Sequence, residues 1–368
     1  MRFHVLAIPH TISMPEYSSC AFTSKVVKLC KMLMRRGHTV IHYGHQDSQV
    51  EATQHVTVTG RYDLDKSYKN HDWRKLGWPK YNEKEDWVYQ VFYKNAIEAL
   101  AGHKQPGDFL LCQFGFMHKP VADAHKDLII VEPGIGYPDG GFAPYRVFES
   151  YSIQSAYQGK NAIGWAKNNF WYDTVIPNYF DLDEFDFSPC VKRDYFLFCG
   201  RVNSGKGIHI AEQISAATNV PLIVAGAGDF KLKPTTQRVG VVGPVERASL
   251  MSGARALLCP STFMEPFCGV QVEAYLSGVP VISSDWGAFA EYNIHGVTGF
   301  RCKTFEQFVW AANHVGELNP QDCRDHGVAF SLERIGPMYE EFFENIARGG
   351  WYAENPDRKD LTRTVFRP

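Results

Sequence analysis

The sequence lacks long hydrophobic runs and a strong net charge. None of its apolar stretches approaches the roughly 20 residues that a membrane-spanning helix needs, and residues 1–9 are too short for the core of a signal peptide, so they predict a buried strand. The formal net charge of -2 gives no reason to expect nucleic acid as a partner. The sequence also has no internal repeat and no low-complexity segment. These absences argue against a membrane-spanning, nucleic-acid-binding or repeat protein and leave an ordinary globular protein.

Cysteines paired at metal-binding spacings are absent as well. The nine cysteines are scattered, and most lie in apolar runs, as Cys112, Cys199 and Cys259 do. Buried cysteines behave as small hydrophobic residues, and disulfides are rare in reducing compartments. We therefore expect reduced core cysteines in a cytoplasmic protein.

What the chain does have is length and an alternation of strands with helices. Its 368 residues exceed what one hydrophobic core usually supports, so two domains are expected. Strands that alternate with helices imply a parallel, doubly wound sheet. In the first half the predicted strands are at residues 1–9, 39–43, 108–112 and 128–131, and the predicted helices are at residues 22–36 and 86–100.

The most informative stretch runs from Glu265 to Glu273. Pro266 disfavours a helical conformation at Glu265 and suits the first position of a helix, so Glu265 is expected on a loop tip and Glu273 on the helix. The free amides at the helix start would offer a diphosphate hydrogen-bond donors and a partial positive charge. They are the amides near Phe267, Cys268 and Gly269. Alone, the stretch fits an amphipathic helix with an acidic cap equally well.

The neighbouring sequence favours a ligand site. Residues 257–261 are typical of a short buried strand that ends in a turn, and residues 270–276 continue as a helix. Residues 278–282 begin another strand. In such parallel sheets, ligands bind beyond the carboxyl ends of the strands, where Glu265 is expected.

With these residues in order, the chain resembles the retaining glycosyltransferases of the GT-B fold. Within them it is similar to the large family marked by a Glu-x7-Glu element, glycosyltransferase family four or "glycosyl transferases group 1". The resemblance covers residues 175–300 strongly and residues 1–150 loosely. The matching landmarks are residues 175–181, 196–201, Lys206-Gly207, residues 222–228 and Val242-Gly243.

The resemblance implies an α/β fold in which two Rossmann-like parallel-sheet domains face each other across a cleft. Residues 1–180 would form the acceptor domain and residues 181–335 the nucleotide-sugar donor domain. Residues 336–368 would form a C-terminal helix and tail that cross back onto the first domain. The acidic segment 181–194 is the expected linker.

Donor-side roles follow from the same resemblance. Arg201 and Lys206 would hold the diphosphate, which a guanidinium fork and an ammonium can neutralise as it leaves. Glu273 would bind the ribose hydroxyls, and Glu265 would contact the transferred sugar. The other donor-side positions are Phe267, Cys268, Gly269, Gly200, Gly243 and Val245, with the base against the backbone of residues 242–245. Family members usually have Gly where this chain has Cys268, which leaves the local loop shape open.

Two further donor-domain features are implied with alternatives. The turn at residues 285–288 would add amides or a lid. Glu291 matches an acidic position of the family, but a helix cap is an equally good interpretation.

The first domain departs further from the family pattern. Its first loop has Cys20 and Ala21 where family members often have glycines. Many members also have a histidine near the end of a later strand, where this chain has Glu132, which we take as a catalytic candidate. The loops around residues 132–145 are rich in glycine and aromatics, which suits a sugar acceptor or an ordinary tight turn. The acceptor-side candidates are His10, His118, Gly134 and Tyr137, a core or solvated histidine being the alternative for the first two.

Three other patterns are weaker. Gly200 to Lys206 has the spacing of a phosphate-binding ATPase loop, but Gly207 stands where that loop needs Ser or Thr. Residues 181–183 match an Asp-x-Asp metal signature, although a turn or helix cap is favoured in a linker. The helix at residues 22–36 carries a basic stripe that can bind an anionic membrane, although a solvated outer face is favoured.

The resemblance therefore implies a retaining, metal-independent glycosyltransferase with no bound cofactor, for which the nucleoside diphosphate sugar is a substrate. It would move a sugar from a UDP- or GDP-linked donor to a hydroxyl of a glycan, glycolipid or small molecule, and the leaving phosphate would take the acceptor proton, as proposed for the family. A sugar-nucleotide epimerase, a phosphorylase, and a non-catalytic sugar-nucleotide or glycan-binding protein are the alternatives. Donor base, acceptor, linkage and oligomeric state stay open.

Overall fold

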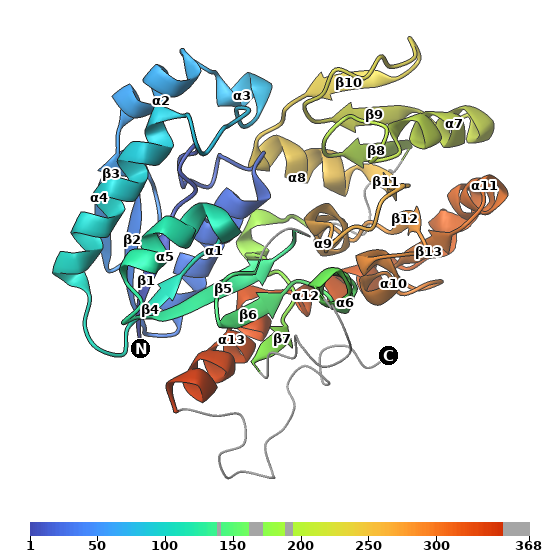
Figure 1. Cartoon of the computed structure of the whole chain (residues 1–368). Helices are drawn as coiled ribbons and strands as arrows, with labels where there is room; N and C mark the ends of the chain where they lie inside the picture. Colours follow the sequence, from blue (N-terminus) through green and yellow to red (C-terminus); the bar gives the residue numbers. More distant parts are fainter. Residues whose placement is uncertain (138–140, 162–171, 188–193, 349–368) are drawn as a thin grey trace.

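The computed structural model describes residues 1–137, 141–161, 172–187 and 194–348, which form two α/β domains (Figure 1). The N-terminal sheet consists of β1 (Arg2–Leu6), β2 (Thr39–His45), β3 (Gln54–Thr59), β4 (Phe109–Leu111), β5 (Ile129–Ile135), β6 (Tyr145–Phe148) and β7 (Asp173–Val175). The C-terminal sheet consists of β8 (Tyr195–Cys199), β9 (Leu222–Ala225), β10 (Gln237–Gly240), β11 (Ala254–Cys259), β12 (Val281–Ser284) and β13 (Gly299–Cys302).

Helices join these strands. Those of the N-terminal half are α1 (Ala21–Arg35), α2 (Arg61–Tyr68), α3 (Trp73–Leu76), α4 (Trp87–His103), α5 (Lys119–Ala124) and α6 (Tyr151–Asn161). Those of the C-terminal half are α7 (Ile208–Thr218), α8 (Pro244–Ser252), α9 (Gly269–Leu276), α10 (Ala288–Tyr292), α11 (Phe305–His314), α12 (Pro320–Val328) and α13 (Leu332–Ala347). Short 3-10 turns are η1 (Gly115–His118), η2 (Leu182–Glu184) and η3 (Val315–Glu317).

Both sheets are parallel throughout. Their strand orders are β3-β2-β1-β4-β5-β6-β7 and β10-β9-β8-β11-β12-β13, and every ladder between these strands is parallel. Where a helix lies between two strands, as α1 does between β1 and β2, the crossover explains this, because a strand, helix, strand unit returns the chain to the same end of the sheet. The predicted class of two Rossmann-like parallel sheets is confirmed. In the second sheet the strand order reverses between β8 and β11, and ligands bind in α/β sheets at such switch points.

The last described helix, α13, crosses back onto the N-terminal domain, as expected (Figure 1). Its buried residues Ile335 and Phe343 join the core formed by β1 and α1. The Phe343 ring lies 4.7 Å from that of Phe3, and the Tyr339 hydroxyl donates to the carbonyl of Pro133 at 2.5 Å. The remainder of the predicted tail, including residues 349–368, lies outside the described residues.

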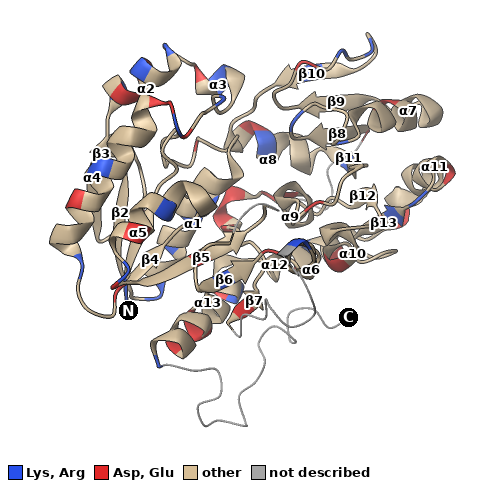
Figure 2. Cartoon of the chain, in the orientation of Figure 1, with Lys and Arg blue, Asp and Glu red and all other residues tan. Residues whose placement is uncertain are grey.

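The basic stripe of α1 is not a solvated face, so that expectation is wrong. Lys25 and Lys28 are each 6% exposed. The stripe pairs with a carboxylate that follows β6 and with carboxylates of the segment between the domains and of α13, and Figure 2 shows the acidic residues along α13. The pairs are Lys25–Glu149, Lys28–Glu184, Lys31–Asp181, Arg35–Glu333 and Arg36–Glu340. These contacts explain the charges on α1 as tertiary ion pairs.

The Asp-x-Asp pattern is part of the same contact. The Asp181 carboxylate accepts from the backbone amide of Asp183 at 3.4 Å and caps η2, which confirms the cap interpretation. No helix among the described residues is long and apolar enough to cross a membrane.

Candidate functional site

The loops that follow β8 and β9 lie against each other and form one wall of the site. Gly200 and Val202 donate their amides to the carbonyls of Ala225 and Ala227, at 2.9 and 2.8 Å. A β-carbon at Gly226 would lie 1.9 Å from the Gly200 carbonyl oxygen, and the φ of Gly226 is +138°. Only glycine fits there, so the two loops meet through their backbones at Gly226.

Lys206 and Glu265 come from the two loops at the switch point. Lys206 Nζ donates to Glu265 Oε1 at 2.6 Å, and Ser261 Oγ donates to the same oxygen at 2.7 Å. Burial lowers the pKa of Lys206, but the Glu265 carboxylate outweighs this, so the pKa of the ammonium lies above its usual value. Arg201 is exposed on the loop that leads to Lys206.

The expected position of Glu265 and of the helix start needs correction. Glu265 is only 3% exposed, so it does not stand on a loop tip. Helix α9 begins at Gly269 rather than at Pro266, because Cys268 precedes it in the left-handed conformation, with a φ of 64°. Phe267 explains the delay, since its buried ring packs 5.1 Å from that of Tyr292 and draws the loop into the core.

The turn after β12 braces the Glu265 loop. A β-carbon at Gly287 would lie 2.9 Å from both the amide nitrogen and the carbonyl oxygen of Glu265, and the φ of Gly287 is +61°. The amide of Ala288 donates to the Glu265 carbonyl at 2.9 Å. The turn that was expected to add amides or a lid therefore contacts the backbone of Glu265 and supports its loop.

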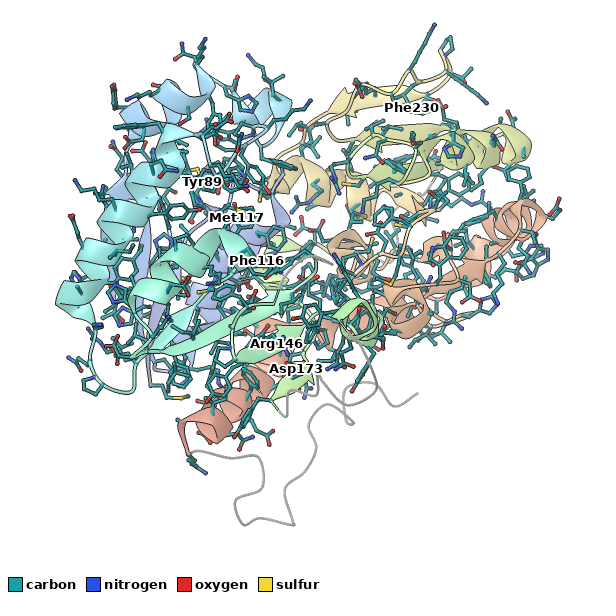
Figure 3. The ribbon with its side chains drawn as sticks, in the orientation of Figure 1. Tyr89, Phe116, Met117, Arg146, Asp173 and Phe230 are labelled. Atoms are coloured by element: carbon teal, nitrogen blue, oxygen red, sulfur yellow. The ribbon has the colours of Figure 1, made fainter. Side chains whose placement is uncertain are left out.

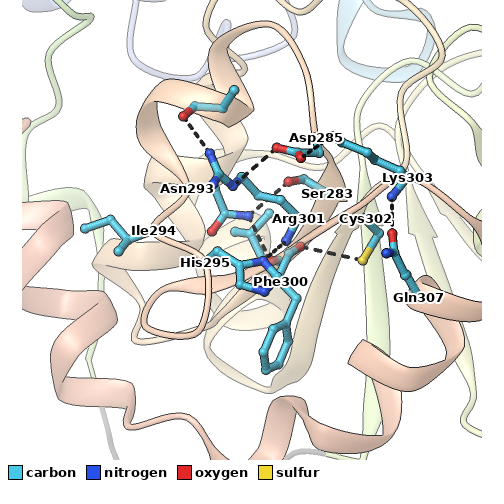
Figure 4. Close-up of polar contacts among 12 residues, drawn as sticks. Ser283, Asp285, Asn293, Ile294, His295, Phe300, Arg301, Cys302, Lys303 and Gln307 are labelled. Atoms are coloured by element: carbon cyan, nitrogen blue, oxygen red, sulfur yellow. Dashed lines mark hydrogen bonds and ion pairs between the residues drawn. The ribbon is translucent and has the colours of Figure 1, made fainter.

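Asp285, in the same turn, is held by two basic residues of β13 and the loop after it. Arg301 Nε and Lys303 Nζ each lie 3.4 Å from an Asp285 oxygen, and Arg301 also donates to the Ala290 carbonyl at 2.7 Å (Figure 4). This network ties β12, α10 and β13 together.

Glu273 has a partner that the sequence interpretation missed. Arg247 Nε, on α8, lies 2.9 Å from Glu273 Oε2, and both side chains are 13% exposed. Burial lowers the pKa of Arg247, but Glu273 outweighs it and leaves the pKa above its usual value. Burial also raises the pKa of the neighbouring Cys199 thiol to about 12, against the opposing effect of Arg247. The only sequence signal for this partner is that Arg247 is a basic residue one turn into the helix that follows Gly243-Pro244.

An open cleft of about 420 Å³ lies between the two domains. Its C-terminal wall includes Gly200, Arg201 and Arg247, so it reaches the partner of Glu273, although Glu273, Lys206 and Glu265 do not themselves line it. The rest of that wall is Cys199, Val202, Asn203, residues 225–229, Val241 and Val242. The N-terminal wall is Ser18, Ser19, Leu76, Gly77, Trp78 and Lys80.

Two donor-side candidates lie at the start of α8, beside the cleft. Gly243 caps the helix with a φ of -74°, and Val245 is 86% exposed, so its side chain packs on nothing.

The two histidine candidates are core residues. His10 is hydrogen-bonded at 2.7 Å to the hydroxyl of Tyr89, a residue of α4 that Figure 3 labels inside the N-terminal domain. His118 Nε2 donates to the Ala7 carbonyl at 3.0 Å and ties η1 to the end of β1. Burial lowers the pKa of each to about 3, so both are neutral at ordinary pH. In this structure they match the core alternative.

Glu132 and Tyr137 hold each other inside the N-terminal domain. Glu132 is 0% exposed and accepts from the Tyr137 hydroxyl and the amide of Ala143, both at 2.9 Å. Burial raises the pKa of Glu132, and these donors oppose the rise. Gly134 accepts from Lys25 Nζ at 2.8 Å through its carbonyl. The carboxylate thus anchors the loop between β5 and β6, of which residues 138–140 lie outside the described residues.

Metal ligands do not gather in the described part of the chain. There, no group of three or more His, Cys, Asp or Glu side chains could hold a metal ion.

Comparison with known proteins identifies the second domain most clearly. The family model for glycosyl transferases group 1 matches residues 193–316. The D-rhamnosyltransferase WbpZ of Pseudomonas aeruginosa is 30% identical over 117 residues, 28% of this chain and 31% of that protein. Glycogen synthase of Mycobacterium tuberculosis is 30% identical over 150 residues, 35% of this chain and 36% of that protein. The chain thus spans about a third of the length of these curated relatives.

Solved structures share the fold over nearly the whole chain. AviGT4, a glycosyltransferase involved in avilamycin A biosynthesis, has 19% identity and a TM-score of 0.71, covering 95% of this chain and 98% of its own. HepE of Anabaena, in complex with UDP and glucose, has 17% identity and a TM-score of 0.65, covering 94% and 99%. The chain therefore has the two-domain GT-B fold of these glycosyltransferase structures, and residues 193–316 of its second domain are similar to the glycosyl transferases group 1 domain.

Proposed function

We propose that this protein is a glycosyltransferase that takes its sugar from a nucleoside diphosphate donor. One observation carries the proposal: Lys206–Glu265 and Arg247–Glu273, at 2.6 and 2.9 Å, flank the N-terminus of α9 beside the interdomain cleft. Cations, carboxylates and a helix N-terminus are the groups that a diphosphate between two sugars requires. The match of residues 193–316 to the glycosyl transferases group 1 model supports the same conclusion.

In this proposal the diphosphate leaves toward Arg201, Lys206 and the first amides of α9. Loss of the diphosphate separates charge, and fixed donors stabilise that charge without reorganising. Glu273 accepts hydrogen bonds from the ribose, and Glu265 from the sugar. Arg201 is exposed and ready to meet a phosphate.

Retention of configuration, independence of metal and the nature of the acceptor are finer parts of the proposal, drawn from the family resemblance. Glu132 is omitted from the catalytic set, because its carboxylate is buried and hydrogen-bonded to its own loop. UDP is the first donor nucleotide to test, because HepE, a protein of similar fold, was solved with UDP and glucose. GDP is the second.

The decisive experiment is a thermal shift with UDP, GDP and ADP on the wild type, Glu273→Ala and Glu246→Ala. A ligand at 100 times its Kd stabilises by about 2.7 kcal/mol, which is easily measured. We expect one nucleotide to stabilise the wild type and Glu246→Ala, whose exposed carboxylate lies on α8, and to have no effect on Glu273→Ala. Failure of all three at millimolar concentration contradicts the proposal.

Turnover separates the alternatives on the same fold. A transferase releases nucleotide faster when an acceptor is added, whereas an epimerase converts the donor without one and a phosphorylase requires phosphate. A non-catalytic binding protein gives the thermal shift but no release from any donor.

A further inference from the structure

The N-terminal domain contributes a complete wall to the cleft. Leu76, Gly77, Trp78 and Lys80 line it from one side, opposite the backbone of residues 225–229 on the other. These four follow or end α3, which Figure 1 shows at the edge of the N-terminal domain that faces the C-terminal domain. Neither the family resemblance nor the motif residues involve this segment.

The segment is held in place by its own contacts. The ring Nε2 of His71 donates to the Gly77 carbonyl at 2.7 Å, and the Asp72 carboxylate caps α3 by accepting from the Arg74 amide at 3.1 Å. Trp73 stacks on buried Tyr17 with ring centroids 4.4 Å apart. The loop is therefore preorganised, and binding a ligand there would order little additional chain.

Gly77 brings the segment into contact with the other domain. Its φ is +75°, and a β-carbon at this position would lie 3.6 Å from the β-carbon of Ala227, in the loop after β9. The same β-carbon would lie 3.9 Å from that of Ser19, whose buried hydroxyl oxygen has no partner among the described residues. The two domains thus meet at one end of the cleft.

Trp78 and Lys80 supply the chemistry of this wall. The Trp78 ring lies 6.0 Å from His10 and 6.1 Å from Tyr81, so neighbouring rings support it from within the domain. Lys80 is exposed, and within the described ranges neither Lys80 nor Arg201 forms an ion pair. An aromatic face and free cations around one cleft fit a ligand that is both aromatic and anionic.

We infer that residues 76–80 form the second wall of the donor site, where Trp78 packs on the nucleoside and Lys80 pairs with the diphosphate. The inference rests on the proposed function and deepens it. The lining on the other side combines the small residues 225–228 with Arg201 and Arg247, so one cleft offers both a surface without bulky side chains for a base and cations for a diphosphate. A volume of about 420 Å³ is in the range of ligand pockets.

The test measures binding of nucleoside diphosphate and of the matching nucleoside by calorimetry, using the nucleotide that stabilises the wild type. The variants are Trp78→Ala, Trp78→Phe and Lys80→Gln, with Trp310→Ala and Lys75→Gln as matched controls on exposed sites. Stacking on an aromatic residue predicts about 10-fold weaker binding of both ligands to Trp78→Ala. Lys80→Gln should weaken the diphosphate about threefold and leave the nucleoside unchanged.

Trp78→Phe guards against a variant that misfolds. It keeps an aromatic face, so we expect it to bind nearly as well as the wild type while losing the ligand-induced quenching of tryptophan fluorescence. Trp310→Ala should keep that quenching.

Wild-type affinity in Trp78→Ala and Lys80→Gln, alongside loss of binding in Glu273→Ala, overturns the inference and leaves the proposed function standing. Absence of nucleotide binding to the wild type overturns both.

Discussion

Arg247 Nε lies 2.9 Å from Glu273 Oε2, and this pair joins α8 to α9 at the edge of the interdomain cleft. Because both side chains are 13% exposed, each charge depends on the other for compensation. Arg247 also lines the cleft, whereas Glu273 does not. Arg247 thus fixes the Glu273 carboxylate from the adjoining helix and occupies one of its two oxygens. In the proposed function this carboxylate accepts hydrogen bonds from the ribose.

Arg247→Met should therefore destabilise the protein. It leaves the Glu273 carboxylate unpaired in a partly buried position, and we expect a loss of about 2 kcal/mol in the free energy of unfolding, measured by urea denaturation. Combining it with Glu273→Gln should recover more than half of the loss, since no uncompensated charge then remains. Equal losses in the single and double variants would show that the pair is not coupled. Glu246→Gln, on the same helix, is the control.

Lys206→Met should affect turnover more than binding. In the proposed reaction the ammonium stabilises the departing diphosphate, so we expect kcat to fall about 100-fold, the scale for removal of one oxyanion-type donor. Glu265 loses its ion-pair partner but keeps the hydrogen bond from Ser261 at 2.7 Å. Lys231→Met, at an exposed site, should retain full kcat. Nucleotide release from the donor gives kcat, and an unchanged value would remove Lys206 from the mechanism.

Gly207→Ala tests the backbone of the Lys206 loop. The φ of Gly207 is +76°, and an added β-carbon would lie 2.0 Å from the carbonyl oxygen of Pro260. Left-handed strain together with a backbone clash should cost about 3 kcal/mol in the free energy of unfolding.

Gly240 provides the matched control for that clash. Its φ is +83°, but an added β-carbon meets nothing within 4 Å. Gly240→Ala should cost only the strain, about 1 kcal/mol. Equal losses of unfolding free energy in the two variants would mean that the Pro260 backbone moves and relieves the clash.

The sequence predicts those elements of the fold whose burial follows a local pattern of apolar residues. Apolar runs mark β8, β9 and β11, and helical spacing of apolar residues marks α1, because burial on these elements follows the sequence period. Two of the missed elements carry no such pattern. Strand β3 has only its last two residues buried, and α2 has no buried residue, so pairing with distant elements creates them.

The site divides in the same way. Glu265 and Glu273 could be proposed because they lie in one contiguous motif, and Lys206 was proposed from the family resemblance. Arg247 was not proposed, because its contact with Glu273 arises only when α8 packs on α9. The burial of His10 and His118 could not be predicted, because their partners, Tyr89 and Ala7, are 79 and 111 residues away along the chain.

The pH dependence of stability should reveal the buried His118. Burial lowers its pKa from 6.5 to about 3, so between these values the unfolded chain binds a proton that the folded chain does not. Stability from this group is complete above pH 6.5 and falls with pH by about 1.4 kcal/mol per unit.

His118→Gln should remove this pH-dependent contribution to stability, and the glutamine side-chain amide can still donate to the Ala7 carbonyl. Between pH 7 and pH 5 the wild type should lose about 2 kcal/mol more than the variant, as measured by urea unfolding at both pH values. Parallel losses in the two proteins would show that His118 does not titrate on unfolding in this range. A large loss in the variant at pH 7 would instead report a packing defect.

The role of Glu291, catalytic or structural, can be tested by mutation. Its carboxylate accepts from the amides of Tyr151 and Ser152, at 2.8 and 2.7 Å, and so caps α6 of the opposite domain. Next to it, the Tyr292 hydroxyl donates to the Glu149 carbonyl at 2.8 Å. Since a lost cap costs about 1 kcal/mol, Glu291→Ala should lower the free energy of unfolding by that amount, whereas the exposed control Glu317→Ala should not. Both variants should keep kcat within about twofold if the carboxylate only joins the domains, because a positioned catalytic group contributes at least about 100-fold. A large loss of kcat at unchanged stability would instead place Glu291 among the reacting groups.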